Sequence, residues 1–534
     1  MVIASFLTML LLSFALAAVA AAQKLSPSVE HAKRSGLPDG WSHVRRHAPD
    51  AVLPLRFGLT QPNVDMNTLE ELLNEISHPE SPNYGMHWTP ERVLTHFAAS
   101  DASQERVRVS KTKGWVIVNA SVAETEMLLS TEYHVYEHGS SGTEHVACDS
   151  YHLPAHIVPH VALVTPSIDF NAVLTKRSAS PRLGHPGARN PLKFKMNSAP
   201  SILSGNDLEN CDQQITPACV RALYGLYYTP VAAHKNSFGI VEYTPQAYRP
   251  ADLDLFASNF SSIGSSPSLV GARPILKAID GGVVQDINVT FEFNVESNFD
   301  LQYAMNLVTR AQDVTLYQVG DIQIGGSFNT LLDAFDGSFC TFEGGTIPAT
   351  DPIYPDTLPG GYTGDDDLCL NPDGTQTEDG TIFNPLFPAT CPFVTGVGAT
   401  QINPGAKVTD PETDSAGGFS NYFARPANPP PYPTTIYNAT SRAVPDISAN
   451  GANFLMAVGG RSIHPVSGTS ASSPVVGAIL TMVNDARLAV GKTPVGFINP
   501  VGRSTTLLNG TNPGCGTDGF PAVEGYDPKW LLLP

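Results

Sequence analysis

The chain has 534 residues, of which 42% are hydrophobic, so it is long enough to form more than one globular domain. Its net charge of −19 is unevenly placed: residues 1–200 hold 17 Lys and Arg against 18 Asp and Glu, and residues 201–534 hold 14 against 32. An acidic C-terminal part argues against nucleic acid as a partner. It suits a protein that works at low pH, where part of this negative charge is neutralised.

The N-terminal residues 1–22 are apolar and end in the small residues Ala20, Ala21 and Ala22. This pattern predicts a signal peptide and therefore secretion. The alternative is a membrane anchor, because a stretch of this length could span a bilayer. No later stretch is long and apolar enough to span, so we expect no membrane association. Five N-x-[ST] sequons are compatible with a secreted glycoprotein: Asn119, Asn259, Asn288, Asn438 and Asn509.

Residues 23–175 are predicted to form one α+β unit. Apolar residues recur at helical spacing in 67–79 and 124–136, and 113–121 is typical of a strand. Residues 176–210 are rich in Pro, Ser and Gly, basic and without periodicity, which indicates a linker. The pair Lys176 and Arg177 at its start is a candidate dibasic processing site.

From Cys211 onward, short apolar runs alternate with longer helical patterns. The runs cover 236–243, 313–320 and 452–460, and the helical patterns cover 294–312 and 470–491. Short, almost wholly apolar runs are typical of buried strands in a parallel sheet. Residues 211–534 are therefore predicted to be an α/β domain with a doubly wound parallel sheet.

The chain contains seven cysteines, an odd number. In an oxidising compartment most of them should pair, which leaves a free thiol or a missing partner. The sequence leaves the pairing open.

Ser470, in the stretch SGTSASSP, is typical of a nucleophile at the start of a helix. A serine hydrolase usually has a histidine as its base, but 13 of the 15 histidines lie between His31 and His185. Only His234 and His464 lie in the α/β part, and both are predicted to be surface or turn residues. A Ser–His–Asp arrangement of the subtilase kind is therefore not supported.

Glu296 and Asp300 offer another base. Their i, i+4 spacing places both carboxylates on one face of the predicted helix. One carboxylate can take the proton of a serine while the second orients it, and two nearby carboxylates split their titration. The alternative is a solvated acidic face. Apolar neighbours such as Phe299 and Leu301 favour a helix that packs inside.

These residues resemble the sedolisins, which are serine-carboxyl peptidases. Ser470 matches their G-T-S-x-x-x-P motif, and Glu296 with Asp300 matches their E-x-x-x-D pair. Further segments, at 81–100, 383–400, 415–423 and 444–451, are also similar, so the resemblance covers nearly the whole chain after the signal peptide. Within the family, the chain looks most like fungal secreted tripeptidyl-peptidases.

The resemblance implies a subtilisin-like catalytic domain behind an inhibitory prodomain, acting on protein and peptide substrates as a monomer. Ser470 would be the nucleophile, Glu296 the base and Asp300 the residue that orients Glu296. The family stabilises the oxyanion with another Asp that stays protonated. It also carries one calcium ion near its C-terminus.

Two parts of the family pattern are missing. The S-S-G-D-x-G turn of the oxyanion Asp has no counterpart, and Asp365, Asp366 and Asp367 are nominal remnants of it. For calcium, Asp527 and the carbonyls of Gly525 and Val523 match half of the site, but Thr506 and Leu507 stand where the family has Asp-Ile. A site with one carboxylate is expected to bind calcium weakly.

The sequence therefore leaves two hypotheses. The first is a secreted, acid-acting peptidase made as a zymogen, which releases tripeptides or, alternatively, cleaves as an endopeptidase. The second is an inactive relative that keeps the fold. Missed exons in the gene prediction are the explanation we prefer for the gaps, and we expect the 534-residue chain as written to be inactive.

Overall fold

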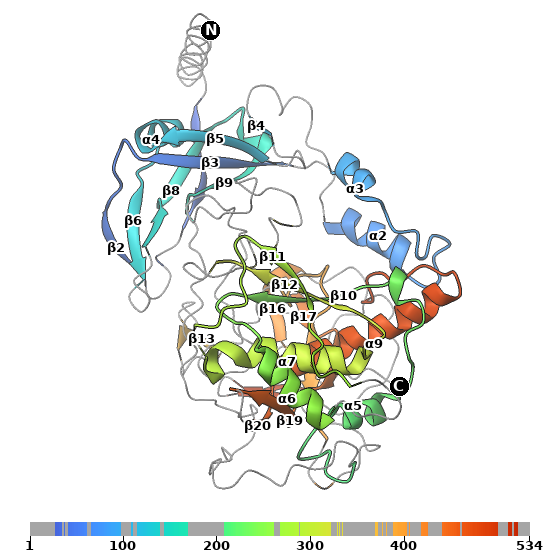
Figure 1. Ribbon diagram of the computed structural model, residues 1–534. Helices are drawn as coiled ribbons and strands as arrows, with labels where there is room; N and C mark the ends of the chain where they lie inside the picture. Colours follow the sequence, from blue (N-terminus) through green and yellow to red (C-terminus); the bar gives the residue numbers. More distant parts are fainter. Residues whose placement is uncertain are drawn as a thin grey trace, which may run out of the picture. The chain divides into compact units, whose positions relative to one another are not determined.

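The computed structural model describes residues 27–34, 37, 41–60, 66–97, 108–109, 115–138, 144–168, 208–260, 268–287, 289–321, 328, 331, 334, 369–371, 376–377, 381, 388–402, 405, 418–424, 441–459, 462–499, 511–514 and 517–521. The chain divides into two compact units (Figure 1). The first comprises Met1–Val64, Thr89–Thr175 and Phe328–Thr357, and the second comprises Asp65–Trp88, Lys176–Ser327 and Leu358–Pro534.

The first unit is an antiparallel β structure with short helices. Its sheets have the orders β4-β5-β3-β9, β2-β6-β7 and β1-β8. The strands are β1 (Ser28–Lys33), β2 (Trp41–Arg46), β3 (Val52–Leu59), β4 (Arg108–Val109), β5 (Trp115–Ser121), β6 (His134–His138), β7 (Glu144–Ala147), β8 (Ser150–Pro154) and β9 (Val161–Thr165). The helices are α3 (Pro90–His96), α4 (Val122–Leu129) and the 3₁₀ turn η2 (Val158–His160).

The core of this unit forms because alternate residues of β3 point inward, where Leu53 and Leu55 are buried against α4. Helix α4 starts with a capping box between Ser121 and Glu124. The prediction of a helix over 124–136 was only half right. The helix ends because Ser130 takes the left-handed conformation (φ 49°), and the chain continues into β6.

The second unit contains the remaining elements. Its helices are α2 (Met66–Ser77), α5 (Pro217–Tyr224), η3 (Ala233–Lys235), α6 (Pro250–Phe260), α7 (Phe291–Val308) and α9 (Thr469–Ala489). Its strands are β10 (Phe238–Tyr243), β11 (Ile275–Ile279), β12 (Val314–Val319), β13 (Cys369–Leu370), β14 (Gln376–Thr377), β15 (Val397–Thr400), β16 (Gly418–Ala424), β17 (Ser441–Val444), β18 (Ile447–Asn450), β19 (Phe454–Val458), β20 (Ser462–Val466), β21 (Thr511–Gly514) and β22 (Thr517–Pro521).

The parallel pairing predicted for the strands at 236–243 and 313–320 is confirmed, since they are β10 and β12. β10 and β11 both pair in parallel with β12, and β15 pairs in parallel with β18. The third prediction was wrong in its pairing, since β19 forms an antiparallel hairpin with β20. The spacing explains this: β19 ends at Val458 and β20 begins at Ser462, and parallel neighbours need a long crossover, so strands this close in sequence can only pair antiparallel.

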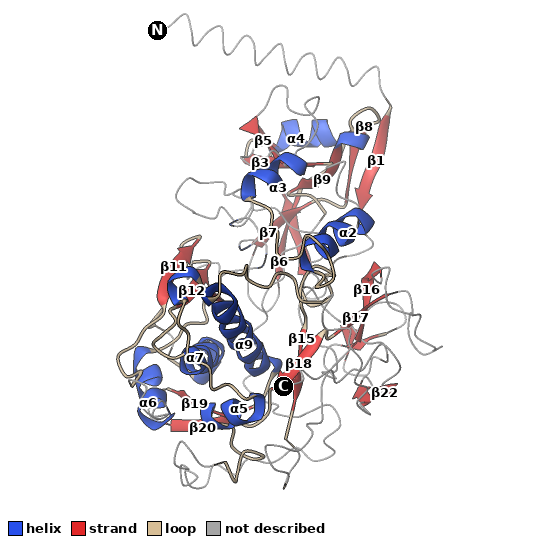
Figure 2. Ribbon diagram, turned by 90° about the vertical axis from the view of Figure 1, so that its right-hand side faces the viewer, coloured by secondary structure: helices blue, strands red, loops and turns tan. Residues whose placement is uncertain are grey.

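The helices predicted for residues 294–312 and 470–491 are present as α7 and α9. The two helices pack against each other in the second unit (Figure 2). Phe299 and Tyr303 of α7 are buried with Phe454 of β19, and their rings meet edge to face. Aromatic rings in this arrangement stabilise the core beyond their burial. Helix α7 is therefore held in the interior by β19 as well as by α9.

A disulfide closes the loop between Cys211 and Cys219 near the start of this unit. The loop is tied to β19 by backbone hydrogen bonds from Ile215 N–H to the Asn453 carbonyl (2.8 Å) and from Leu455 N–H to the Ile215 carbonyl (2.9 Å).

A search of the described helices finds none whose length and hydropathy would allow it to cross a bilayer. The predicted signal peptide, residues 1–22, lies outside the described residues.

Candidate active site

Three carboxyl groups meet inside the second unit. Glu296 and Asp300 lie on α7, whose N-terminus is capped by the Thr290 side chain, which accepts from Phe293 N–H. Glu242 lies on β10, is only 3% exposed and shares a hydrogen bond with Asp300. The strand and the helix are held together by the core around Phe299.

Burial determines the protonation of this cluster. It raises the pKa of Glu242 well above the usual value, and the negative charges of Asp300 and Glu296 raise it further. Burial and the charge of Glu296 likewise raise the pKa of Asp300 well above its usual value, although the bond to Glu242 acts in the opposite direction. Two carboxylates cannot donate to each other, so a hydrogen bond between Glu242 and Asp300 forms only while one of the two groups is protonated.

Glu242 was missed by the sequence analysis, which considered only pairs of acids on one helix. A signal was present. In FGIVEY, Phe238, Ile240 and Glu242 occupy the buried positions of the strand, because side chains alternate from face to face. A glutamate at the third inward position of an apolar strand indicates a buried carboxyl with a specific partner.

Ser470 lies in the first turn of α9 and is half-buried. Pro474 lies inside the same helix and has no N–H, so the Ser470 carbonyl receives no i+4 helical hydrogen bond. Since α9 packs on α7, the structure brings together the helix of Ser470 and the helix of Glu296 and Asp300. Within the described part of the chain, the Ser470 hydroxyl makes no hydrogen bond to Glu296.

Helix α7 is fixed to β19 by side chains that follow Asp300. The Gln302 amide donates to the Ala457 carbonyl (2.7 Å) and accepts from Ala457 N–H (2.9 Å). The Tyr303 hydroxyl lies 2.8 Å from the carbonyls of Ile215 and Leu455. A helix held in this way cannot turn about its axis, so the positions of Glu296 and Asp300 are fixed.

The two late histidines lie on other elements than the carboxyl groups. His234 is exposed in η3, as predicted, and its charge acts on Asp485 rather than on Ser470. His464 lies in β20, where its backbone pairs with Met456. Nothing in the described structure places an imidazole beside Ser470.

Several predicted sites lie outside the described residues. They are the oxyanion candidates Asp365, Asp366 and Asp367, the calcium candidates Asp527, Gly525, Val523, Thr506 and Leu507, the processing pair Lys176 and Arg177, and the sequons Asn288, Asn438 and Asn509. Within the described residues, no three His, Cys, Asp or Glu side chains are grouped so that they could hold a metal ion.

The other two sequons are described. Asn119 is exposed on β5, so its amide is accessible. Asn259 is half-buried on α6, and its amide donates to the Leu255 carbonyl at 2.8 Å. Asn119 is therefore the better candidate for glycosylation of these two.

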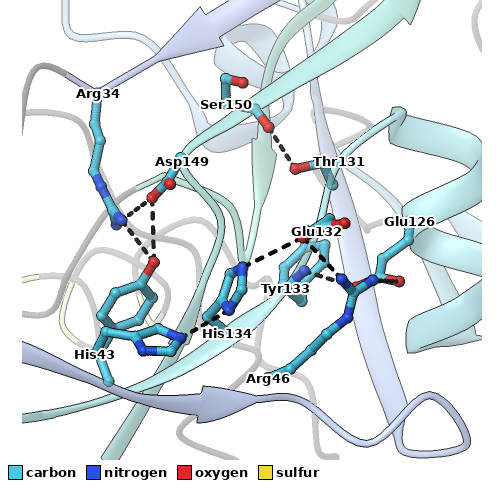
Figure 3. A network of polar contacts seen from close by, with 11 residues as sticks. Arg34, His43, Arg46, Glu126, Thr131, Glu132, Tyr133, His134, Asp149 and Ser150 are labelled. Atoms are coloured by element: carbon cyan, nitrogen blue, oxygen red, sulfur yellow. Dashed lines mark hydrogen bonds and ion pairs between the residues drawn. The ribbon is translucent and has the colours of Figure 1, made fainter.

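The first unit holds a separate polar network between β2, β6 and α4 (Figure 3). His43 Nε2 and His134 Nδ1 lie 3.0 Å apart, so one ring donates and the other accepts. His134 also lies 3.9 Å from Glu132, and Glu132 pairs with Arg46 at 2.8 Å. Two imidazoles can share a hydrogen bond only while one of the facing nitrogens is unprotonated.

Comparison with known families matches residues 39–170 to the Pro-kumamolisin activation domain. Aorsin of Aspergillus oryzae is 33% identical, with 94% of this chain and 93% of that protein covered. Tripeptidyl-peptidase sed1 of Aspergillus fumigatus is 34% identical, with 96% and 95% covered. The alignment with aorsin runs over 623 positions, more than the 534 residues of this chain, so it contains positions at which only aorsin has a residue.

Among solved structures, a Pseudomonas sedolisin, a serine-carboxyl proteinase complexed with pseudo-iodotyrostatin, overlaps with a TM-score of 0.40 at 18% identity. The match covers 60% of this chain and 96% of that one. Because this TM-score is low, the family is assigned from the sequence relatives alone.

Proposed function

Because the chain belongs to the sedolisin family of serine-carboxyl peptidases, we propose that it is a secreted zymogen that acts at acid pH and releases tripeptides from the N-termini of peptides. The tripeptide specificity is supported by the names of the relatives, since several of them are tripeptidyl-peptidases. Secretion is supported by the apolar residues 1–22.

The observation that carries the proposal is the carboxyl cluster formed by Glu296 and Asp300 of α7, the helix that packs against α9, with Glu242 of β10. In this proposal Ser470 attacks the scissile carbonyl, and Glu296 takes its proton and later donates it to the leaving amine. Asp300 orients Glu296. A base of this kind works at a pH at which an imidazole would be protonated.

The activation domain is proposed to act as an intramolecular inhibitor until the chain is cut in the linker, where Lys176 and Arg177 are the candidate site. The doubly wound sheet predicted for residues 211–534 and the monomeric state are part of the same proposal. Calcium is proposed as a weakly bound ion on Asp527 and the carbonyls of Gly525 and Val523, because the donor set has a single carboxylate.

The test compares two peptides that differ only at the N-terminus, one free and one acetylated. Purified protein that has matured at acid pH should release tripeptides from the free peptide only. Replacement of Ser470 by Ala should abolish release. Cleavage inside the acetylated peptide would identify an endopeptidase, and cleavage that survives S470A would contradict the assigned nucleophile.

A second candidate, an inactive sedolisin-like protein, is favoured by one observation. The alignment with aorsin contains positions where this chain has no residue, and Asp365 or Asp366 would have to serve as oxyanion donor without the family's turn. Loss of one oxyanion donor costs about 10²–10³ in turnover. The chain as written and a version with the family segment restored should be assayed together. Equal activity would exclude the second candidate and indicate Asp365, Asp366 or Asp367 as the donor.

A further inference from the structure

Residues 66–88, here named the clasp, belong in sequence to the activation domain but in structure to the second unit. The family match covers 39–170, yet Asp65–Trp88 groups with the peptidase elements, while the residues on both sides of it group with the first unit. The clasp consists of α2 and the loop that follows it (Figure 1).

The clasp is folded by its own hydrogen bonds. Gly85 N–H donates to the Ile76 carbonyl at the end of α2 (2.8 Å). The Asn83 amide donates to the Glu75 carboxylate (2.6 Å), and the Ser81 hydroxyl donates to the Glu75 carbonyl (2.5 Å). The loop is therefore held against its helix by bonds within the clasp itself.

The surface that the clasp contacts is also preformed. It is the last turn of α9 with the loop after it, here named the α9 end and comprising residues 484–496. Arg487 Nε donates to the Thr493 carbonyl (2.8 Å), and Val495 N–H donates to the Asn484 side chain (2.7 Å). These bonds lie within the α9 end, so its shape does not depend on the clasp.

Specific contacts join the two surfaces. His87 Nε2–H donates to the Pro494 carbonyl (3.1 Å), and the Arg487 guanidinium lies over the Tyr84 ring, 5.2 Å from its centre. The second contact is a cation–π interaction. His87 of the clasp thus contacts a backbone carbonyl of the α9 end, and Arg487 of the α9 end contacts an aromatic ring of the clasp.

Glycines allow the close approach on both sides. A Cβ at Gly85 would lie 2.1 Å from Thr493 Oγ1, and a Cβ at Gly496 would lie 2.7 Å from His87 Cε1. Real Cβ atoms are essentially never found at such distances. The two surfaces fit each other only because both positions lack a side chain.

We propose that the α9 end is a docking surface whose occupant is the clasp, and that the clasp anchors the activation domain to the peptidase unit. Ser470 and Arg487 are separated along α9 by about 25 Å at 1.5 Å per residue. The anchor is therefore remote from the nucleophile and holds the prosegment without entering the catalytic site. Docking of the clasp on the α9 end does not depend on whether the chain is catalytically active.

The experiment is hydrogen–deuterium exchange of the intact chain, read on peptides from α2. Gly496→Ala introduces the collision with His87, at a position where the backbone tolerates alanine. Gly491→Ala is the matched control in the same loop: its φ of +76° makes alanine strained, but its Cβ meets nothing within 4 Å. We expect G496A to raise α2 exchange about tenfold, the factor for losing a hydrogen bond and a cation–π contact. G491A should leave it within twofold.

Tyr84→Ala and His87→Ala test the same contact from the clasp side. Each should raise α2 exchange, while exchange in β10 and β12 stays unchanged and reports that the peptidase unit is folded. Unchanged α2 exchange in G496A, Y84A and H87A would overturn the proposal. Equal effects of G496A and G491A would also overturn it, because they would show loop strain rather than docking.

Discussion

Glu242 of β10 and Asp300 of α7 share one hydrogen bond between two carboxyl groups, and that bond requires a proton. Burial raises the pKa of both groups above the values of the unfolded chain. The folded state therefore binds more protons than the unfolded state, and this contribution to the free energy of unfolding is present at low pH and lost as pH rises. The peptidase unit should gain stability from this pair in the range where the proposed function operates.

Glu242→Gln should flatten this dependence, because an amide donates to Asp300 at every pH. We expect the free energy of unfolding of the wild-type protein to fall between pH 4 and pH 7 more steeply than that of E242Q, measured by urea denaturation. Asp313→Asn, an exposed acid beside β12, is the control and should keep the wild-type slope. An unchanged slope in E242Q would show that the pair holds no proton.

Asp485 of α9 has the opposite effect on how the free energy of unfolding changes with pH. It accepts hydrogen bonds from the Tyr228 hydroxyl (2.6 Å), Val231 N–H (2.7 Å) and Ala232 N–H (2.8 Å). Burial alone would raise the pKa of Asp485, but these bonds outweigh it and the pKa is lowered. The bond to Asp485 raises the pKa of Tyr228 to about 12.

Asp485→Asn should therefore destabilise the second unit by about 2 kcal/mol at pH 7, because an amide nitrogen must face one of the three donors. Tyr228→Phe removes a single bond and should cost about 1 kcal/mol. Thermal and urea unfolding measure both. The stabilisation by Asp485 is lost as pH falls through its lowered pKa, so the difference between D485N and wild type should shrink in strong acid. A constant difference would contradict the assignment.

If the serine–carboxyl assignment is right, replacing His234 and His464 by Gln in a segment-restored, active protein should leave turnover within about twofold. Neither imidazole is needed as base in that mechanism. Steady-state kinetics at acid pH on a tripeptide-releasing substrate measure this. Loss of turnover in either single variant would mean that a histidine takes the proton of Ser470.

The sequence predicted those features that depend on local pattern. The helices around Glu296 and Ser470 and the strands β10 and β12 follow from periodicity and short apolar runs. The end of α4 at Ser130 depends on one left-handed residue, which periodicity does not report. The antiparallel pairing of β19 depends on the length of the turn after it. The third carboxyl, Glu242, comes from a strand, and only the fold shows that it meets Asp300.

The disulfide-closed loop at Cys211–Cys219 has a consequence if the chain, as proposed, releases tripeptides from free N-termini. Cleavage anywhere in the linker creates a new terminus a short distance before this loop. An exopeptidase needs an extended, mobile end, whereas the chain from Cys211 is cross-linked and Ile215 is hydrogen-bonded on both sides to β19. Successive molecules of the mature enzyme could therefore shorten one another only as far as this loop, which protects the peptidase from digestion by its own kind.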